Sequence, residues 1–351
     1  MSAPRLPPLP VIRDILKLYN LSAIKRLSQN FLLDQNITNK IVAKAGKISG
    51  AEVLEVGPGP GGLTQSILRQ VPERLIVVEK DKRFKPTLEM LADSFGAING
   101  KMDIMYDDIL KTNMESLFSL EKKRNWNDKP PDIFVIGNLP FNLATHLIIK
   151  WLHAISEQRG LWAFGRTKMT LTFQKEVAER LVAQPLENQR CRLSVMAQTW
   201  TFPVLRFIIP GKAFVPKPDV DVGVVSFTPL VKPRTQHDFK FFEMITRHVF
   251  SFRQKYSVRC IETLFPKELR KDLGLMMYKL ADLDPTLRPT QLTIEDINRL
   301  ATAYKYLLEK HPELKLYNYR SSRHLLPLND TKNVVVQDCA EMLEENVGMS
   351  I

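Results

Sequence analysis

The chain has 351 residues, of which 44% are hydrophobic and 25% are charged, a composition typical of a globular protein that is long enough for two domains. Its net charge of +12 favours a nucleic acid or another anionic surface as a partner, although a basic balance also suits an alkaline compartment such as the mitochondrial matrix. Cys191, Cys260 and Cys339 lack the spacing of a disulfide framework or a metal site, and no apolar run is long enough to cross a membrane.

The first 27 residues are basic and poor in acids, with five Lys or Arg residues against Asp14 alone. Residues 11–24 have the pattern of an amphipathic helix, and a start of this kind is typical of a mitochondrial targeting segment. Four prolines within the first ten residues disfavour a helix at the extreme end. An N-terminal arm of the folded domain therefore explains residues 1–27 equally well.

The next segment, 28–34, combines apolar and capping residues. Asp34 suits the cap of a helix that begins near Asn36, because its carboxylate accepts the free N–H groups of a first helical turn. Phe31 and Leu32 either close over a ligand or anchor the segment to the core, and the spacing alone favours the anchor.

A glycine-rich loop, 57–62, lies between a predicted strand over 51–56 and a predicted helix over 63–68. With Glu79 at the end of the following strand, 75–78, the loop fits the G-x-G-x-x-G pattern of a dinucleotide site and its ribose-binding acid. Two prolines inside the loop argue against a bound pyrophosphate, because each removes a backbone N–H. A ligand with a ribose and an adenine but no phosphate fits better, and S-adenosylmethionine is such a ligand.

The third predicted strand, 102–106, ends in Asp107 and Asp108. A carboxylate at this edge of an α/β sheet is able to accept a hydrogen bond from an adenine amine, and it serves equally well as a helix cap.

The sequence Asn-Leu-Pro-Phe at 138–141 follows the fourth predicted strand, 133–136, and precedes a helical pattern over 143–155. Asn138 offers a side-chain carbonyl acceptor and Phe141 offers a ring for stacking. These groups suit the binding of a flat base that carries an exocyclic amine. An ordinary strand-to-helix turn is the alternative, because Asn and Pro are common turn residues.

The alternation of strands and helices continues to residue 227. A strand is predicted over 168–173, helices over 174–181 and 193–200, and a closing pair of strands over 207–209 and 222–227, with a proline-punctuated basic loop at 212–221. This alternation predicts an α/β fold with a mostly parallel sheet and helices on both of its faces.

The composition changes after Pro229, where a linker at 231–237 is followed by predicted helices over 239–252, 258–264, 267–280 and 294–308. This segment is basic, and its Lys and Arg residues alternate with aromatic residues, a pattern that suits RNA binding as well as an ordinary solvated surface. The residues concerned are Arg247, Phe250, Phe252, Arg253, Lys255, Tyr256, Arg259, Lys267, Arg270 and Lys271. The tail, 321–351, carries five acidic residues against two basic ones, and we expect it to be poorly ordered.

Together these features resemble the ribosomal RNA adenine-N6,N6-dimethyltransferases, and among them the mitochondrial branch. The likeness is carried by Asp108 and by segments 28–32, 55–61, 78–80, 138–141, 172–176 and 214–218. It implies a Rossmann-like, S-adenosylmethionine-dependent methyltransferase domain over 28–230 and a small helical RNA-binding domain over 238–320. Asp107 replaces the glycine that is common in the family before the adenine-binding acid, and Val222 stands where bacterial members usually have serine.

The resemblance also implies roles for single residues. At the cofactor it implies Gln29 and Leu32 at the methionine end, Gly57 beneath it, Glu79 on the ribose hydroxyls, Lys80 beside the adenine, Asp108 and Ile109 at the adenine amine, and Asn138. The implied catalytic motif is Asn138, Leu139, Pro140 and Phe141. No metal is implied.

The function that the resemblance implies is S-adenosylmethionine-dependent N6,N6-dimethylation of two adjacent adenines in a hairpin loop near the 3′ end of mitochondrial small-subunit (12S) ribosomal RNA. The chain is expected to act as a monomer in the matrix, with the assembling small ribosomal subunit as a partner and the mitochondrial transcription machinery as a further candidate. The main alternative is a non-catalytic nucleic-acid-binding factor, which would not need Gly57, Glu79, Asp108 and Asn138 together. A nucleotide-dependent oxidoreductase is disfavoured by the loop prolines and by the sequence at 138–141.

Overall fold

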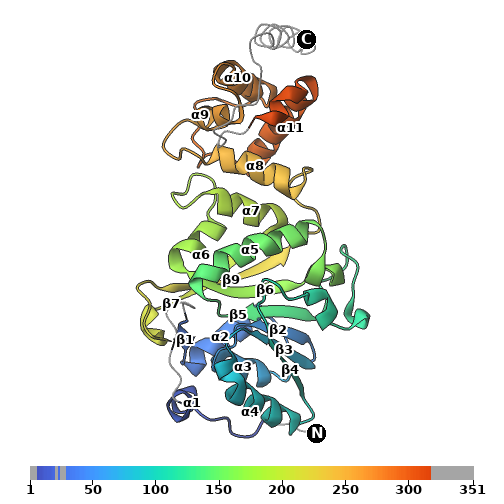
Figure 1. Ribbon diagram of the computed structural model, residues 1–351, viewed down its shortest axis with the longest axis vertical. Helices are drawn as coiled ribbons and strands as arrows, with labels where there is room; N and C mark the ends of the chain where they lie inside the picture. Colours follow the sequence, from blue (N-terminus) through green and yellow to red (C-terminus); the bar gives the residue numbers. More distant parts are fainter. Residues whose placement is uncertain (1–5, 20–22, 24–28, 318–351) are drawn as a thin grey trace. The chain divides into compact units, whose positions relative to one another are not determined.

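Figure 1 shows the computed structural model of the chain, in which residues 6–19, 23 and 29–317 are described. The predictions that concern the other N-terminal residues and the acidic tail, 321–351, lie outside this part of the chain. Among the described residues, no helix is both long and apolar enough to span a lipid bilayer.

The described residues form two compact units. The first reaches Val182 and also includes Trp200–Pro233, whereas the second combines Ala183–Thr199 with the residues from Arg234 onward.

A seven-stranded sheet organises the described part of the first unit (Figure 1). In spatial order its strands are β4 (Lys101–Tyr106), β3 (Arg74–Glu79), β2 (Glu52–Val56), β5 (Ile133–Gly137), β6 (Lys168–Gln174), β9 (Val222–Pro229) and β7 (Thr201–Ile209). The first five run parallel, and β9 is antiparallel to both of its neighbours. The predicted α/β class and the mostly parallel sheet are therefore confirmed.

Helices cover both faces of the sheet, and the central strands β2 and β5 are buried along their whole length. This burial is expected for parallel strands between two layers of helices. In Figure 1, α2, α3 and α4 lie below the sheet, and α5 and α6 lie above it. Their bounds are α2 (Gln35–Ala45), α3 (Gly62–Leu68), α4 (Lys85–Gly96), α5 (Phe141–Ser156) and α6 (Lys175–Val182).

The strand order reverses between β2 and β5. Chain order leads outward from β2 through β3 to β4 on one side, and from β5 to β6 on the other. Ligands of open α/β sheets bind beyond the carboxyl ends of the strands at such a switch point. Val56, the last residue of β2, pairs with Gly137, the last residue of β5, so the glycine loop and Asn138 follow two adjacent strand ends.

Three parts of the first unit differ from the sequence predictions. The loop predicted over 212–221 contains a short strand, β8 (Phe214–Val215), because its backbone pairs with β1 (Phe31–Leu32). The strand predicted to begin at residue 207 begins at Thr201 as β7. Helix α4 has no counterpart among the predicted helices, although a proline in its first turn is a common start signal.

The N-terminal residues of the described chain pack on the first unit. Helix α1 (Ile12–Leu18) is shorter than the helix predicted over 11–24, part of which lies outside the described residues. Ile12 and Ile15 are buried, and the Gln65 side chain donates a hydrogen bond of 2.9 Å to the Pro10 carbonyl. Asp34 caps α2 through the N–H groups of the next turn, as predicted.

The second unit is helical. Its helices are α7 (Arg192–Trp200, whose last residue falls in the first unit), α8 (Phe239–Val249), α9 (Ser257–Ile261), α10 (Arg270–Leu280) and α11 (Ile294–Lys310). The methyltransferase domain was predicted as continuous over 28–230, but residues 183–199 belong to this second unit. Hydrogen bonds explain the difference, because Leu186 N donates to Thr290 O at 2.8 Å and buried Arg190 donates to Leu292 O at 3.5 Å.

An exposed loop joins α8 to α9. The helix predicted over 239–252 ends at Val249, and residues 251–256 are all exposed. Phe252 and Tyr256 have 42% and 52% of their surface exposed, whereas most aromatic side chains of a folded protein are buried. Arg253 and Lys255 thus belong to a loop and not to a helix face.

Candidate active site

Two adjoining cavities open at the switch point of the sheet, with empty volumes of about 670 and 830 Å³. They share five lining residues, namely Gln29, Gly57, Glu79, Leu139 and Pro140. Leu32, Asn138 and Phe141 line the smaller cavity, and Lys80, Asp108 and Ile109 line the larger one. Every residue singled out from the sequence for catalysis or cofactor binding therefore lines one cavity or both.

The glycine loop, 57–62, follows β2 and lines the cavities beside the end of β3. Gly57, Gly59 and Gly61 have φ angles of 66°, 55° and 94°, a region that side chains beyond glycine rarely adopt. The N–H of Gly59 donates to Oε2 of Glu79 at 2.9 Å, and the N–H of Gly61 donates to the Pro58 carbonyl at 3.0 Å. These N–H groups are thus engaged within the protein, which disfavours a phosphate in the loop.

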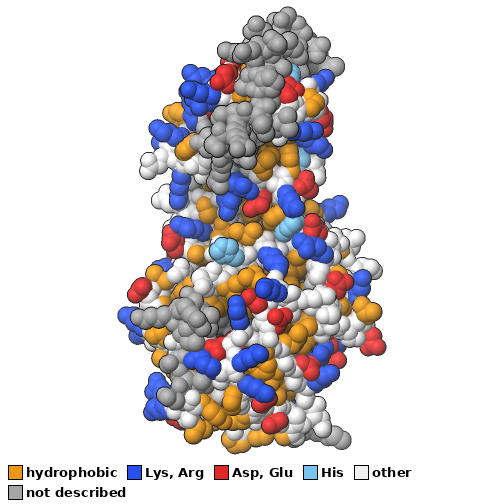
Figure 2. Space-filling model, viewed as in Figure 1, with side chains coloured by type: hydrophobic (Ala, Val, Ile, Leu, Met, Phe, Trp, Pro, Cys, Tyr) orange, Lys and Arg blue, Asp and Glu red, His pale blue; other side chains and the backbone are white. Residues whose placement is uncertain are grey.

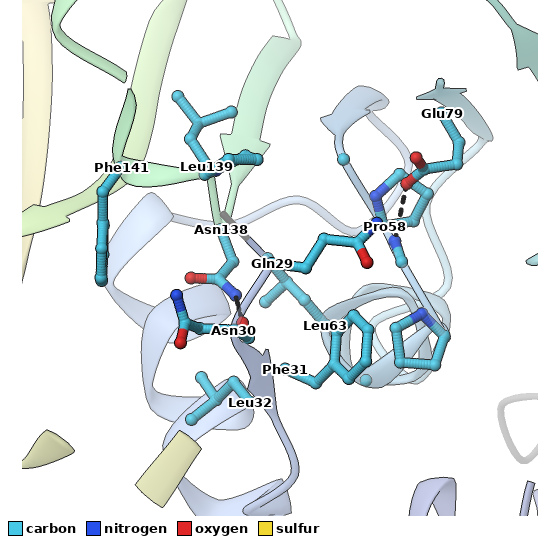
Figure 3. Close-up of a pocket in the computed structure, with 15 residues that line it drawn as sticks. Gln29, Asn30, Phe31, Leu32, Pro58, Leu63, Glu79, Asn138, Leu139 and Phe141 are labelled. Atoms are coloured by element: carbon cyan, nitrogen blue, oxygen red, sulfur yellow. Dashed lines mark hydrogen bonds between the residues drawn. The ribbon is translucent and has the colours of Figure 1, made fainter. Parts of the chain in front are cut away.

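Glu79 ends β3 on the opposite side of the cavity from Asn138 and Phe141 (Figure 3). Its Oε1 accepts the N–H of Asp81 at 2.7 Å, while Oε2 accepts that of Gly59. Burial raises the pKa of the Glu79 carboxyl, and the two N–H groups oppose that shift. Each carboxylate oxygen has more than one acceptor site, so both remain able to accept a hydroxyl of a ribose.

Gln29 is held beside Glu79 by a small polar network. Its Nε2 donates to Oδ2 of Asp81 at 3.0 Å, and Arg83 donates to the same oxygen at 2.6 Å. Asp81 is 8% exposed, so its partly buried hydrogen bond to Gln29 fixes the segment that carries Gln29.

Asp108 lines the larger cavity at the end of β4. Its Oδ2 accepts from Lys80 Nζ at 2.9 Å and its Oδ1 accepts the N–H of Leu110 at 3.0 Å, and these two hydrogen bonds lower the pKa of the Asp108 carboxyl. The carboxylate thus caps a turn and also lines the larger cavity, and its hydrogen bond to an adenine amine stays a prediction. Asp107 accepts from the N–H of Asp108 at 2.7 Å and from the Thr112 hydroxyl at 2.9 Å, which shows what this aspartate does in place of the family's glycine.

Asn138 is held at both ends of its side-chain amide. Its Nδ2 donates to the Asn30 carbonyl at 3.2 Å, and its Oδ1 accepts from the Thr172 hydroxyl at 2.9 Å. Pro140 is the N-cap residue of α5, and Phe141 is its first residue. The Phe141 ring stands at the edge of the cavity beyond Asn138 (Figure 3).

Phe31 and Leu32 anchor their segment to the core, as the spacing favoured, and closure over a ligand stays a prediction. They are 6% and 5% exposed and belong to the hydrophobic core, and they also line the smaller cavity. Pairing of β1 with β8 holds them there.

Four further residues of the site received no role of their own from the sequence: Asn30, Asp81, Arg83 and Thr172. Asp81 lies two residues after Glu79, and Asn30 and Thr172 lie in segments 28–32 and 172–176, which carry the resemblance. Asn30 and Thr172 act through contacts with a residue 108 and 34 positions away, and no periodicity reports such contacts.

A comparison with protein families decides what kind of protein carries this site. The model of the ribosomal RNA adenine dimethylase family matches residues 20–317. The chain belongs to this family. The chain is therefore a methyltransferase, and its Rossmann-like sheet is that of a ribosomal RNA adenine dimethylase.

Similar proteins extend over nearly the whole chain of this dimethylase. A protein from Homo sapiens named mitochondrial dimethyladenosine transferase 1 is 52% identical over 320 residues, which cover 91% of this chain and 92% of that protein. Proteins of the same name from Xenopus tropicalis and Drosophila melanogaster are 51% and 50% identical, over 92% of this chain and 93% and 96% of theirs.

Solved structures share the fold of this dimethylase. A dimethyladenosine transferase from Plasmodium falciparum gives a TM-score of 0.59 at 20% identity, covering 78% of this chain and 96% of its own. The 23S rRNA methyltransferase ErmE gives 0.54 at 17% identity, covering 79% of this chain and all of its own.

Proposed function

We propose that the chain uses S-adenosylmethionine to dimethylate N6 of two adjacent adenines in a hairpin loop near the 3′ end of mitochondrial small-subunit (12S) ribosomal RNA. It does so as a monomer in the mitochondrial matrix and thereby supports assembly of the small ribosomal subunit. The observation that carries the proposal is the amide of Asn138, fixed on both sides, in a cavity that Glu79 also lines. The names of the similar proteins support the substrate class and the organelle.

The hydrogen-bond acceptors of the cavities fit S-adenosylmethionine. Glu79 retains acceptor sites for two ribose hydroxyls, and Asp108 is an acceptor for an adenine amine in the larger cavity. Gln29 and Leu32 stand in the smaller cavity for the methionine end. The glycine loop has no N–H to spare at Gly59 or Gly61 for a phosphate. When bound, the sulfonium of this cofactor supplies an electrophilic methyl group.

The residues at 138–141 prepare the adenine for methylation. The N6 amine is a poor nucleophile because its lone pair is delocalised into the ring. In this proposal Asn138 Oδ1 and the Leu139 carbonyl accept hydrogen bonds from the amine, which draws it toward tetrahedral geometry and frees the lone pair. No strong base is needed, since the proton leaves after transfer. Positioning of this kind lowers the activation free energy by roughly 7–11 kcal/mol in well-oriented reactions.

Phe141 has the second part of this task. An adenine within an RNA loop must leave its stack before its amine can enter a closed site. The Phe141 ring, at the cavity edge, replaces the lost stacking, and such base–aromatic contacts are worth about 1–3 kcal/mol.

The exposed loop of the second unit is the proposed RNA contact. Lys and Arg side chains are spread over the face shown in Figure 2, with Asp and Glu among them, so net charge alone does not locate the RNA. Arg253 and Lys255 are exposed, and neither has an ion-pair partner within the described residues. Arg259, in contrast, pairs with Glu262 at 2.7 Å. Unpaired charges beside exposed Phe252 and Tyr256 suit phosphates and bases.

The test is methylation of the unmodified 12S hairpin by the purified protein, with mass spectrometry that counts zero, one and two methyl groups on each adenine. The wild-type chain is expected to yield dimethyladenosine. Asn138→Ala should nearly abolish transfer and retain the affinity for cofactor and RNA, because alanine cannot accept a hydrogen bond from the amine. A wild-type chain that binds the hairpin but leaves it unmethylated would instead be the non-catalytic nucleic-acid-binding factor.

A further inference from the structure

The amide of Asn138 is oriented by two groups outside its own motif. One is the Asn30 carbonyl, in the segment that leads into β1, and the other is the Thr172 hydroxyl on β6. β5 and β6 run parallel with Gly137 opposite Leu171, so Thr172 lies one position further, beside Asn138. Thr172 is 0% exposed, so water does not compete for its hydroxyl.

The chemistry of these two partners allows one orientation of the amide. A backbone carbonyl only accepts hydrogen bonds, whereas a hydroxyl either donates or accepts. The amide nitrogen must therefore face Asn30 O, because a flipped amide would bring two acceptor oxygens together at this distance, 3.2 Å. The oxygen of Asn138 then faces Thr172, whose hydroxyl donates its proton to it.

This orientation matters for the proposed chemistry. An N6 amine needs an acceptor, and a flipped Asn138 would present N–H donors to it. Oδ1 has two acceptor sites and Thr172 occupies one, which leaves one for the substrate. The Asn30 carbonyl thus fixes which atom of the amide meets the amine, and the Thr172 hydroxyl fixes the direction of that atom.

We propose that Thr172 is a positioning residue for the catalytic amide, acting together with the carbonyl of Asn30. The proposal rests on the proposed function, in which Asn138 acts on the adenine amine. The three segments that meet here are the end of β5, β6 and the residues before β1. Pairing of β1 with β8, in which Phe31 lies opposite Val215, is what holds Asn30 against Asn138.

The chain offers a matched control on the same strand. Thr170 is two positions from Thr172, is 2% exposed, and shares a hydrogen bond of 3.0 Å with Ser226. Thr170→Val therefore removes a buried hydroxyl from the same face of β6 without touching Asn138. Thr172→Val makes the same change at the site, and Thr172→Ser restores the hydroxyl.

The experiment measures single-turnover methylation, cofactor affinity and RNA affinity for these variants. Thr172→Val is expected to lower the methylation rate on the order of tenfold, the effect of one hydrogen bond, with both affinities within about twofold of wild type. Thr172→Ser should recover most of the rate, and Thr170→Val should keep it. A full rate in Thr172→Val, or a rate loss in Thr170→Val equal to that in Thr172→Val, overturns the proposal.

A second measurement is independent of activity. The side-chain amide signal of Asn138 in an NMR spectrum is assigned by its loss in Asn138→Ala. Its hydrogen exchange is expected to speed up in Thr172→Val but not in Thr170→Val, and equal exchange in both variants contradicts the role of Thr172. If the wild-type chain leaves the hairpin unmethylated, the proposed function fails. If Asn138→Ala methylates normally, the role of Asn138 fails and this inference fails with it. If Asn138→Ala is inactive while Thr172→Val matches wild type, the function stands and this inference alone fails.

Discussion

The backbone N–H of Gly59 donates a hydrogen bond of 2.9 Å to Oε2 of Glu79. This contact joins the loop after β2 to the acid at the end of β3, so the two features that the sequence suggested for a cofactor are one structural unit. A change at Glu79 should consequently affect both the acceptor for the ribose and the shape of the loop.

Glu79→Ala is expected to lower the affinity for S-adenosylmethionine by about a hundredfold, because hydrogen bonds to a charged group contribute about 1.5–3 kcal/mol each. Calorimetry with the purified variant measures this. Glu89→Ala is the control, because Glu89 is an exposed acid on α4. Equal cofactor affinity in the two variants would remove Glu79 from the site.

The buried acid Glu55 should make stability depend on pH. Its side chain is 0% exposed, and burial raises the pKa of its carboxyl from 4.5 to about 8, against an opposing effect of the Thr64 hydroxyl. The folded chain therefore keeps a proton that the unfolded chain releases. The contribution of Glu55 to stability is fully present below pH 4.5 and is lost as the pH rises to about 8.

Glu55→Gln stays neutral at every pH, so it should lose less stability than wild type between pH 5 and pH 8. The difference in the free energy of unfolding between Glu55→Gln and wild type should grow by at most about 1.4 kcal/mol for each pH unit. Denaturant unfolding at both pH values measures it, with the exposed Glu115→Gln as control. Parallel stability curves for wild type and Glu55→Gln would show that Glu55 ionises normally.

The exposed loop between α8 and α9 should control the salt dependence of RNA binding. Each phosphate contact contributes about 0.9 to the slope of log affinity against log salt. The double change Arg253→Gln with Lys255→Gln is expected to reduce that slope by about 1.8 on the 12S hairpin, with cofactor affinity unchanged. Lys47→Gln with Lys85→Gln removes the same charge from exposed positions of the first unit. If the two double variants have the same slope, the RNA does not contact this loop.

The N-terminal helix α1 should be part of the stable fold. Ile15 is 2% exposed, whereas Leu18 on the same helix is 77% exposed. Ile15→Ala is expected to reduce the free energy of unfolding by about 2 kcal/mol or more, and Leu18→Ala should leave it nearly unchanged. The same contacts predict that the mature protein in mitochondria begins before Pro10. A mature N-terminus beyond residue 19 would instead identify this segment as a removable targeting sequence.

Local features of this protein were readable from the order of its amino acids. Each of these features affects the structure of residues close to it in the sequence. They are the strand patterns of β2, β3 and β5, the carboxylate of Asp34 before α2, and the glycines between β2 and α3. The parallel α/β class follows from their alternation, and the cavity-lining residues from their positions at strand ends. Helix α4 was missed although its signals are local.

Contacts between distant segments could not be read in the same way. β8 is a strand because β1 pairs with it, and its own residues look like a proline-rich loop. Residues 183–199 belong to the helical unit because Leu186 and Arg190 bond to residues about a hundred positions away. The amide of Asn138 is oriented by Asn30 and Thr172 only once the sheet has assembled. Hydrogen bonds and packing depend on distance in space, and a sequence pattern records only the neighbours of a residue along the chain.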